Sequence, residues 1–368
     1  HPTNTKPVLI TGGCGFLGCN IAAVLARSGR NVIVADNLSR AGTEQNAEWL
    51  RHQYSDRVTI EIADTRDASA MDDLISHASA VMHLAAQVAV TTSLDRPTED
   101  FDINARGTLN VLESVRRLNP GAPVIFASTN KVYGKLLDGQ SVFRAGGHYV
   151  PNHRRFAHGV SEDMPLDLYS PYGCSKGAAD QYVHDYARIY GLRTVVLRMS
   201  CIYGPRQFGN EDQGWIAHFL LQAMRGEPIT IYGDGFQVRD ALFVDDAVAA
   251  WIGCLDQISD VQGDIFNLGG GAANTASLRE MLDMVGELRG KTPEIRFAAW
   301  RPGDQPWYVS DIRKISAALG WSPRVPLRSG LRALARWLGR DQELSDEQVA
   351  PLVGREAAPL LHDAGAKS

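Results

Sequence analysis

The chain has 368 residues, of which 44% are hydrophobic and 21% charged, and it carries a formal net charge of −5. Charges of both signs are interspersed and the pI is near 6.1, so no basic face is large enough for nucleic acid, although residues 153–155 form a small basic cluster. No apolar run approaches membrane-spanning length, and residues 1–7 lack a signal-peptide core. The five cysteines lack metal-ligand spacing. We expect a cytoplasmic protein with reduced thiols that binds no nucleic acid, membrane or structural metal.

A glycine-rich loop separates the first expected strand from the first expected helix. The apolar run at residues 8–10 suits a buried parallel strand, and the G-x-x-G-x-x-G pattern of residues 12–18 follows it. Such glycines permit a tight turn and let backbone N–H groups approach a pyrophosphate at the helix N-terminus. A second expected strand, residues 31–35, ends at Asp36, whose carboxylate can bind the adenosine ribose hydroxyls and would repel a 2′-phosphate. The pattern predicts NAD rather than NADP, with Arg40 nearby able to stack on adenine or to meet a 2′-phosphate.

Strand and helix patterns continue to alternate, which predicts an α/β fold with a doubly wound parallel sheet of the Rossmann type. After the expected strand at residues 58–62, Asp64 could hold the adenine amino group. In the expected strand at residues 80–87, small residues would let the backbone run beside the cofactor, and we interpret His83 as a packed core histidine rather than a catalytic one. A further strand ends at Thr129. Because ligands of open α/β sheets bind at the carboxyl ends of strands, Thr129 can hydrogen-bond a reacting hydroxyl.

Tyr172 and Lys176 stand four residues apart at the start of a segment with helical periodicity. Residues at i and i+4 share a helix face, so the Lys176 ammonium can favour the ionised form of the Tyr172 phenol. Lowering a phenol pKa from about 10 to about 7 requires roughly 4 kcal/mol, which the lysine and an oxidised nicotinamide ring together can supply. Tyr172 would then take a proton from a sugar hydroxyl while hydride leaves the same carbon. The spacing alone also fits an ordinary surface pair, so its weight comes from the glycine-rich loop before it.

Together these motifs resemble the extended short-chain dehydrogenase/reductase superfamily, the NAD-dependent epimerase/dehydratase type, over residues 8–334. The resemblance implies that Thr129, Tyr172 and Lys176 form the catalytic trio. It also implies that NAD is the cofactor and that the substrate is a small molecule, a nucleotide-activated sugar.

The resemblance also assigns binding residues. Arg239 and Arg301 suit a diphosphate because each guanidinium can donate a bidentate pair, with a surface salt bridge as the alternative for either. Asn104, in a helix behind the site, is interpreted as a structural buttress. The residues expected at the cofactor are Gly12, Gly15, Phe16, Leu17, Gly18, Asp36, Asn37, Ser39, Arg40, Asp64, Thr65, Leu84, Ala85, Ala86, Gln87, Asn104, Ser128, Tyr172, Lys176 and Met199. Those expected at the substrate are Gln87, Thr92, Ser93, Cys201, Gln207, Tyr232, Arg239, Arg301 and Asp304.

The residues after Thr129 distinguish the reactions of the superfamily. A 4,6-dehydratase on this scaffold needs an acidic pair there, a carboxylate to remove the C5 proton and an acid for the leaving hydroxyl. Asn130 and Lys131 occupy those positions, which argues against dehydration, although Lys131 could equally be a solvated loop lysine. A narrower group, the CDP-paratose (CDP-tyvelose) 2-epimerases, also has a long connection like that of residues 135–167. The segments that resemble this group are residues 36–40, 87–93, 128–134, 170–182 and 212–215.

The narrower resemblance implies inversion at C2 of a CDP-deoxyhexose. Tyr172 would remove the C2 hydroxyl proton as hydride leaves, the 2-keto sugar would rotate, and hydride would return to the opposite face. Thr129 would orient the hydroxyl, and Lys176 would hold the nicotinamide ribose. Two alternatives remain. A UDP-hexose or UDP-uronate 4-epimerase would use the same trio at C4, and a non-catalytic NAD-sensing regulator would bind NAD without turnover, although such regulators typically lose the tyrosine or the lysine.

The same reasoning divides the chain. We expect residues 1–196 to form mainly the NAD-binding Rossmann domain. Residues 197–340 should form mainly a smaller, discontinuous α/β lobe for the sugar nucleotide, interleaved with the first, and residues 341–368 a loosely attached tail. The helix after Tyr172 carries several aromatic side chains, and the resemblance suggests that such helices pair between subunits. We therefore expect a homodimer or homotetramer, with packing on the sheet as the alternative.

Overall fold

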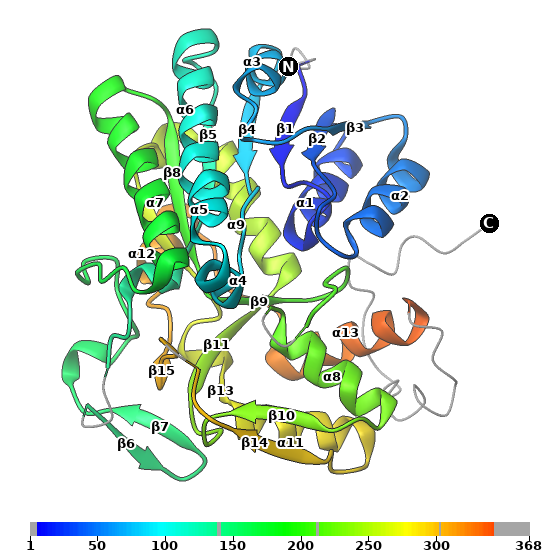
Figure 1. The fold of residues 1–368 in the computed structure, drawn as a ribbon, viewed down its shortest axis with the longest axis vertical. Coiled ribbons are helices and arrows are strands. Elements are labelled where there is room, and N and C mark those ends of the chain that lie inside the picture. Colours follow the sequence, from blue (N-terminus) through cyan, green and yellow to red (C-terminus); the bar gives the residue numbers. More distant parts are fainter. Residues whose placement is uncertain (1–5, 138–140, 211–212, 302, 342–368) are drawn as a thin grey trace.

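A seven-stranded parallel sheet dominates the computed structural model, which describes residues 6–137, 141–210, 213–301 and 303–341 (Figure 1). The strands lie in the order β12-β8-β5-β4-β1-β2-β3. The order reverses at β1, which is the doubly wound Rossmann arrangement, so the predicted fold class is confirmed. The strands are β1 (Val8–Thr11), β2 (Val32–Asp36), β3 (Val58–Ile62), β4 (Ala80–His83), β5 (Val124–Thr129), β8 (Thr194–Met199) and β12 (Ile265–Leu268).

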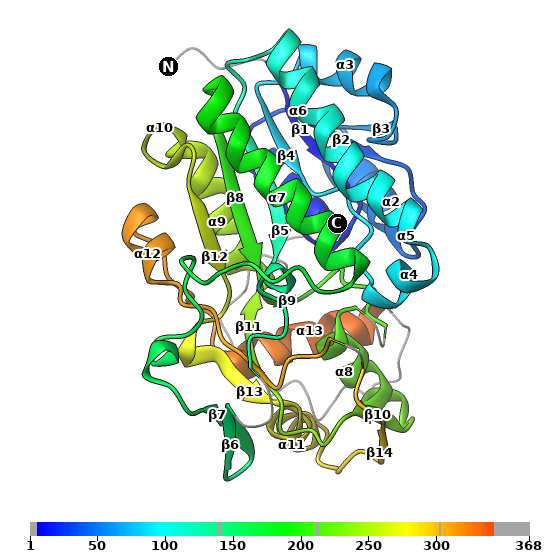
Figure 2. The same cartoon turned by 60° about the vertical axis from the view of Figure 1, so that its left-hand side comes forward.

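Helices cover both faces of this sheet, which explains the continuous apolar runs in its strands. Successive residues of β1 point to opposite faces: Leu9 packs in the core with helices α3, α6 and α7, whereas Val8 and Ile10 pack with α1, α2 and α9. Figure 2 shows α6 and α7 lying together on one side of the strands. The helices around the sheet are α1 (Phe16–Arg27), α2 (Thr43–Tyr54), α3 (Ala68–Ser76), α6 (Gly107–Leu118), α7 (Ser170–Tyr190), α9 (Val244–Asp256), α10 (Ile258–Val261) and α12 (Arg313–Leu319).

The helix predicted around the Tyr-x-x-x-Lys pair is confirmed as α7. Pro171 stands in its first turn, where a missing N–H costs nothing, and Gly191 ends it in the left-handed conformation with φ 66°. The predicted strand at residues 80–87 is shorter in the structure. Strand β4 ends at His83, and only one further backbone bond, from Leu84 N to Thr11 O at 3.0 Å, continues the pairing because β1 ends there.

A smaller lobe packs below the carboxyl ends of the large sheet in Figure 1. Strand β11 is its centre: it pairs in parallel with β9 and β15 and antiparallel with β13, while β10 and β14 form a separate pair. The chain leaves the large sheet after β8 and returns to it at β12. The elements of this lobe are β9 (Cys201–Tyr203), α8 (Trp215–Arg225), β10 (Ile229–Tyr232), β11 (Val238–Phe243), η4 (Ala272–Asn274), β13 (Thr275–Ser277), α11 (Leu278–Arg289), β14 (Ile295–Ala298), β15 (Trp307–Tyr308) and α13 (Leu327–Asp341).

The long connection between β5 and α7 reaches the smaller lobe through a hairpin, β6 (Val142–Ala145) and β7 (His148–Pro151), followed by a short helix η3 (Arg154–Phe156). Tyr149 N donates to Phe236 O at 2.9 Å, and the Tyr149 hydroxyl donates to Asp234 at 2.5 Å. The Arg144 guanidinium lies 4.2 Å from the centre of the Phe236 ring. Of the helices described, none has the length and apolar character needed to cross a membrane. The expected tail lies outside the described residues.

Candidate active site

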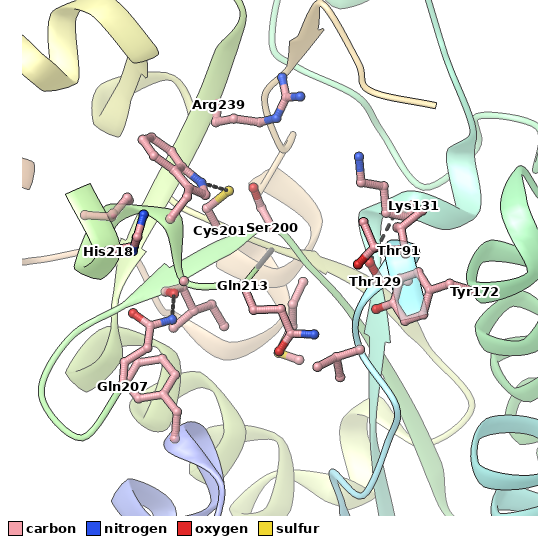
Figure 3. A pocket seen from close by; sticks show the side chains of 18 of the residues that line it. Thr91, Thr129, Lys131, Tyr172, Ser200, Cys201, Gln207, Gln213, His218 and Arg239 are labelled. Carbon is pink, nitrogen blue, oxygen red and sulfur yellow. Dashed lines mark hydrogen bonds between the residues drawn. The ribbon is translucent and has the colours of Figure 1, made fainter. Parts of the chain in front are cut away.

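A cavity of about 520 Å³ opens between the two lobes, at the carboxyl ends of the large-sheet strands (Figure 3). Its walls come from the start of α1, from β5 and α7, and from β9, β10 and β11 of the smaller lobe. The cavity therefore brings together residues that the sequence analysis assigned separately to cofactor, chemistry and substrate. The expected site residues that line it are Gly15, Phe16, Leu17, Arg40, Thr129, Tyr172, Met199, Cys201, Gln207, Tyr232, Arg239, Arg301 and Asp304.

Thr129 and Tyr172 lie side by side in the wall of the cavity, as Figure 3 shows. Thr129 ends β5, and its hydroxyl accepts a hydrogen bond from Lys131 N at 3.2 Å, which caps the short helix η2 (Asn130–Tyr133). Burial raises the pKa of Tyr172 to about 12, although a hydrogen bond with the Thr129 hydroxyl lowers that pKa. The protein alone therefore keeps the phenol protonated at neutral pH.

Lys176 contacts the strand rather than the phenol. Its ammonium donates to Ala127 O at 2.6 Å and lies 4.4 Å from the centre of the Phe126 ring. Burial lowers the pKa of Lys176 to about 7, against the opposing effect of Asp180 and Asp100. The sequence analysis expected Lys176 and an oxidised nicotinamide ring together to lower the Tyr172 pKa. In the protein without NAD, burial dominates and the pKa is raised, so the nicotinamide charge remains a required part of that expectation.

The start of α1 forms the cofactor end of the cavity. Gly15, Phe16 and Leu17 line the cavity there, and within the described part of the chain no side chain caps this helix N-terminus. Its backbone N–H groups and its dipole therefore suit a pyrophosphate, so the residues present fit a dinucleotide. Gly12, with φ +66°, and Gly18 are also required for close packing: a Cβ on Gly12 would lie 2.6 Å from Ala85 N, and one on Gly18 would lie 2.6 Å from Gly12 O.

Asp36 lies at the end of β2, beside this loop. Its carboxylate accepts from Cys14 N at 3.0 Å and from Leu38 N at 2.9 Å, and burial raises its pKa. Asp64, by contrast, is held by a neighbour: two hydrogen bonds from the Arg66 side chain lower the Asp64 pKa to about 2. The adenine contact expected of Asp64 would have to compete with this arginine.

Several expected cofactor residues lie behind the cavity wall rather than in it. Ser128 donates to Asp180 at 2.6 Å, so its hydroxyl points into the core. Asn104, in the π-helical segment η1 (Asp102–Arg106), bonds Gln87 N and O at 2.9 Å and Ser175 Oγ at 3.0 Å. These are the contacts of a buttress between the β4 loop and α7. The expected site residues outside the lining are Gly12, Gly18, Asp36, Asn37, Ser39, Asp64, Thr65, Leu84, Ala85, Ala86, Gln87, Thr92, Ser93, Asn104, Ser128 and Lys176.

Three of the residues expected at the substrate, Gln87, Thr92 and Ser93, lie outside the cavity lining. The Gln87 side chain donates to Ala89 O at 2.9 Å and to Asp100 at 2.7 Å, so it stabilises the loop in which it lies. Ser93 is buried in α4 (Val90–Asp95) and donates to Val90 O at 2.7 Å. Thr92 does not line the cavity; its helix presents Val90, Thr91 and Leu94 there.

His83 is confirmed as a core histidine. It is fully buried, its ring nitrogens bond the hydroxyls of Thr11 at 2.6 Å and Thr108 at 2.9 Å, and burial lowers its pKa to about 3. It therefore stays neutral at any physiological pH.

The opposite end of the cavity is charged. Arg239 donates to Asp304 at 2.6 Å and to Val238 O at 2.7 Å, and Lys131 lies 3.9 Å from the same Asp304 oxygen. The Arg301 guanidinium lies 3.8 Å from the centre of the Tyr232 ring. Both arginines thus line the cavity, and the salt bridge considered as an alternative for Arg239 is present within it.

The sequence analysis missed some cavity residues because they carry no motif of their own. Thr91 is one helix position from a residue that it chose, and His218 lies on α8. Only the alternation of apolar and polar faces along these helices could have indicated them. The lining residues to which it gave no role include Thr91, Ser200, Arg206, Phe208, Gln213, Trp215 and His218.

Comparison with known proteins agrees with this geometry. Residues 8–269 match the model of the NAD dependent epimerase/dehydratase family. The chain is 41% identical to the CDP-paratose 2-epimerase of Salmonella typhi, covering 90% of this chain and 98% of that protein. It is 31% identical to a putative UDP-glucose 4-epimerase of Methanocaldococcus jannaschii, over 90% of this chain and 98% of that protein.

Solved structures of similar proteins include cofactor complexes. The UDP-glucuronic acid 4-epimerase of Bacillus cereus, solved with UDP-glucuronic acid and NAD, superposes with a TM-score of 0.79 at 27% identity, covering 91% of this chain and 99% of that chain. The UDP-glucose 4-epimerase of Thermus thermophilus, in complex with NAD, superposes with a TM-score of 0.75 at 32% identity, covering 90% of this chain and 98% of that chain. The chain belongs to the NAD-dependent epimerase/dehydratase family of nucleotide-sugar enzymes, and its cofactor is NAD.

Proposed function

We propose that this enzyme inverts C2 of a CDP-deoxyhexose, interconverting sugars of the CDP-paratose and CDP-tyvelose type. The observation that carries the proposal is the pair of side chains after Thr129. Asn130 and Lys131 line the cavity beside Tyr172, where a 4,6-dehydratase would need two acids. The 41% identity to a CDP-paratose 2-epimerase, against 32% to a dTDP-glucose 4,6-dehydratase of Neisseria meningitidis, supports the same choice.

In the proposed reaction, Tyr172 takes the proton of the C2 hydroxyl and later returns a proton to the ketone oxygen. The Thr129 hydroxyl, next to the phenol, orients the reacting hydroxyl. Bound NAD supplies a hydride acceptor that gives the hydride back, so no net oxidation occurs. Lys176 is held against β5 by its hydrogen bond to Ala127 O, and its protonated form would favour the phenolate.

Inversion requires the sugar ring to turn while its nucleotide stays bound. The ketone must present its other face, so the contacts that persist must lie on the nucleotide and the diphosphate. The charged end of the cavity, with Arg239 and Arg301, supplies groups of the required kind.

Proton NMR in D2O tests the proposal, with the purified enzyme, no added NAD, and CDP-paratose, CDP-tyvelose, CDP-glucose and UDP-glucose as substrates. We expect inversion at C2 of a CDP sugar with no deuterium at the inverted carbon. Deuterium at that carbon would contradict internal hydride return. A Tyr172→Phe sample is the control for background exchange.

A UDP-hexose or UDP-uronate 4-epimerase is the second candidate. It is supported by the similarity to 4-epimerases, including the UDP-glucuronate 4-epimerase of Thermodesulfobacterium geofontis at 30% identity over 91% of this chain and 97% of that protein. Inversion of UDP-glucose at C4 in the same experiment would establish it. A non-catalytic regulator would turn over none of the substrates, although Tyr172 and Lys176 are both present.

We also propose a homo-oligomer formed through α7. Tyr182, Ile189 and Tyr190 are exposed on this helix, which leaves an apolar strip on its outer side. Light scattering with size-exclusion chromatography tests the proposal, with Ile189→Glu as the variant expected to yield monomers. A wild-type protein that elutes as a monomer would contradict it.

A further inference from the structure

Lys131 is a cation in the cavity that the proposed chemistry does not use. It follows Thr129 by two residues, and Figure 3 shows its side chain beside Thr129 and Tyr172. Its side chain is 28% exposed, so it is not the solvated loop lysine considered as an alternative. In the described part of the chain, its ammonium has one charged neighbour within 4 Å, the Asp304 carboxylate at 3.9 Å, which is too far for a hydrogen bond. Among the described residues no hydrogen bond holds the Lys131 ammonium, so its N–H donors are available to a ligand in the cavity.

Asp304 also changes the charge that the two arginines present. Its Oδ1 atom accepts from Arg239 at 2.6 Å and from Gln305 N at 3.0 Å. Although burial raises the pKa of Asp304, Arg239 and Lys131 lower it on balance, so the carboxylate is ionised at neutral pH. The two positive charges of Arg239 and Arg301 and the one negative charge of Asp304 sum to a single positive charge. The diphosphate diester of a nucleotide sugar carries two negative charges.

Lys131 adds a third cation at this end of the cavity, so that these three cations and one carboxylate have a surplus of two positive charges among them; Arg40 and Arg206 also line the cavity. The position of Lys131 also fits, since it lies between the reacting end at Thr129 and the charged end at Arg239. We propose that Lys131 is a substrate-positioning residue that binds the sugar-proximal phosphate of the nucleotide sugar, with Asp304 as the internal counter-ion that it leaves when substrate binds. This inference rests on the proposed function for a nucleotide-sugar substrate, but not on the identity of the base or on C2 as the reacting carbon.

The role has a mechanistic consequence. The sugar-proximal phosphate is the point about which the ketone must turn, so a cation held there fixes the pivot while leaving the ring free. An ammonium suits this role better than a guanidinium fork, because it is a compact charge with rotatable donors and imposes no bidentate geometry.

Calorimetric titration with cytidine, CMP and CDP tests the inference without requiring turnover. The ratio of the CDP and CMP affinities measures the contribution of the second phosphate. We expect Lys131→Met to reduce this ratio by about tenfold, the value of one charge-assisted hydrogen bond, and to leave the CMP-to-cytidine ratio unchanged. Lys131→Arg should recover most of the loss. Lys291→Met removes the same charge from an exposed site after α11 and should change neither ratio.

Asp304→Asn distinguishes a counter-ion from a substrate contact. Removing the carboxylate should raise the CDP-to-CMP ratio, because it repels the diphosphate; a lower ratio would overturn the counter-ion role. A Lys131→Met protein that keeps the wild-type ratio but loses activity would place Lys131 at the sugar and overturn the proposal. Parallel titrations with uridine, UMP and UDP measure the preference for the base. They therefore separate an error in the choice of cytosine as the base from an error in the role of Lys131.

Discussion

The Lys176 ammonium donates a 2.6 Å hydrogen bond to the backbone carbonyl oxygen of Ala127, two residues before Thr129 on β5. This bond joins α7 to the strand that carries the threonine, so Tyr172 and Thr129 keep a fixed separation. It also holds a positive charge in the core, where burial lowers the Lys176 pKa to about 7. The hydrogen bond orders the site, but the burial of the lysine charge that accompanies it lowers the free energy of unfolding.

This cost predicts that Lys176→Met increases the free energy of unfolding, by an amount that depends on pH. The lysine pKa is about 7 when folded and 10.5 in its unperturbed form, so between these values the unfolded chain binds more protons and wild-type stability rises with pH. Removing the lysine should stabilise the NAD-free protein more at pH 6 than at pH 9, by up to about 2–3 kcal/mol. Urea unfolding at both pH values, with Lys291→Met as the control, measures the difference. Equal gains at the two pH values would contradict the prediction.

Tyr172 should titrate differently with and without its cofactor. Burial raises its pKa to about 12 in the protein alone, and the positive charge of an oxidised nicotinamide should lower it. The absorbance difference between wild type and Tyr172→Phe near 295 nm follows the phenolate directly. The expected result is a titration above pH 10 without NAD and at lower pH with NAD.

Tyr172→Phe should also reduce kcat by about 10²–10⁴-fold, the usual contribution of a general acid–base group, while NAD binding remains. Tyr190→Phe, at the exposed end of the same helix, is the matched control and should retain wild-type kcat. Near-normal turnover by Tyr172→Phe would assign the proton transfer to another group.

Arg198 and Asp180 form a buried ion pair beneath the site, with side chains 3% and 0% exposed. Arg198 makes two hydrogen bonds to Asp180, at 2.8 and 2.9 Å. Arg198→Met should destabilise the protein by about 3–5 kcal/mol, because it leaves a buried carboxylate without its counter-charge. Arg188→Met breaks an exposed pair with Asp185, 59% and 43% exposed, and should cost less than about 1 kcal/mol. Urea denaturation compares the two variants, and similar losses would contradict the prediction.

Asp36 should determine the preference for NAD over NADP. Its carboxylate is fixed by Cys14 N and Leu38 N at the end of β2, and it would repel a 2′-phosphate. Asp36→Ser should lower the ratio of NAD to NADP affinity by about tenfold or more, as expected for losing a charge-assisted hydrogen bond to ribose and a repulsion to phosphate together. Equilibrium dialysis with both cofactors measures the ratio. An unchanged ratio would assign the preference to Arg40 or to another group.

Local patterns predicted the parts of the site that local geometry controls. The glycine loop and the Tyr172–Lys176 spacing could be read directly, because each depends on a few neighbouring residues. Thr92 and Ser93 were expected at the substrate, whereas Thr91 is the residue that lines the cavity, because the rotation of α4 depends on its packing on α7, nearly eighty residues later in the sequence. The pairing of Arg239 with Asp304 likewise joins residues 65 positions apart. The periodicity of the sequence does not indicate such long-range contacts.

The repeated passage of the chain between the large sheet and the smaller lobe limits how this enzyme can change. Segments of the smaller lobe lie between β5 and α7, between β8 and β12, and after β12. A new substrate lobe could therefore not be acquired by a single recombination event, since several junctions would have to match at once. Divergence in specificity on this scaffold must instead proceed through single replacements inside a retained cavity, and a position such as Lys131 is where such a replacement would have its effect.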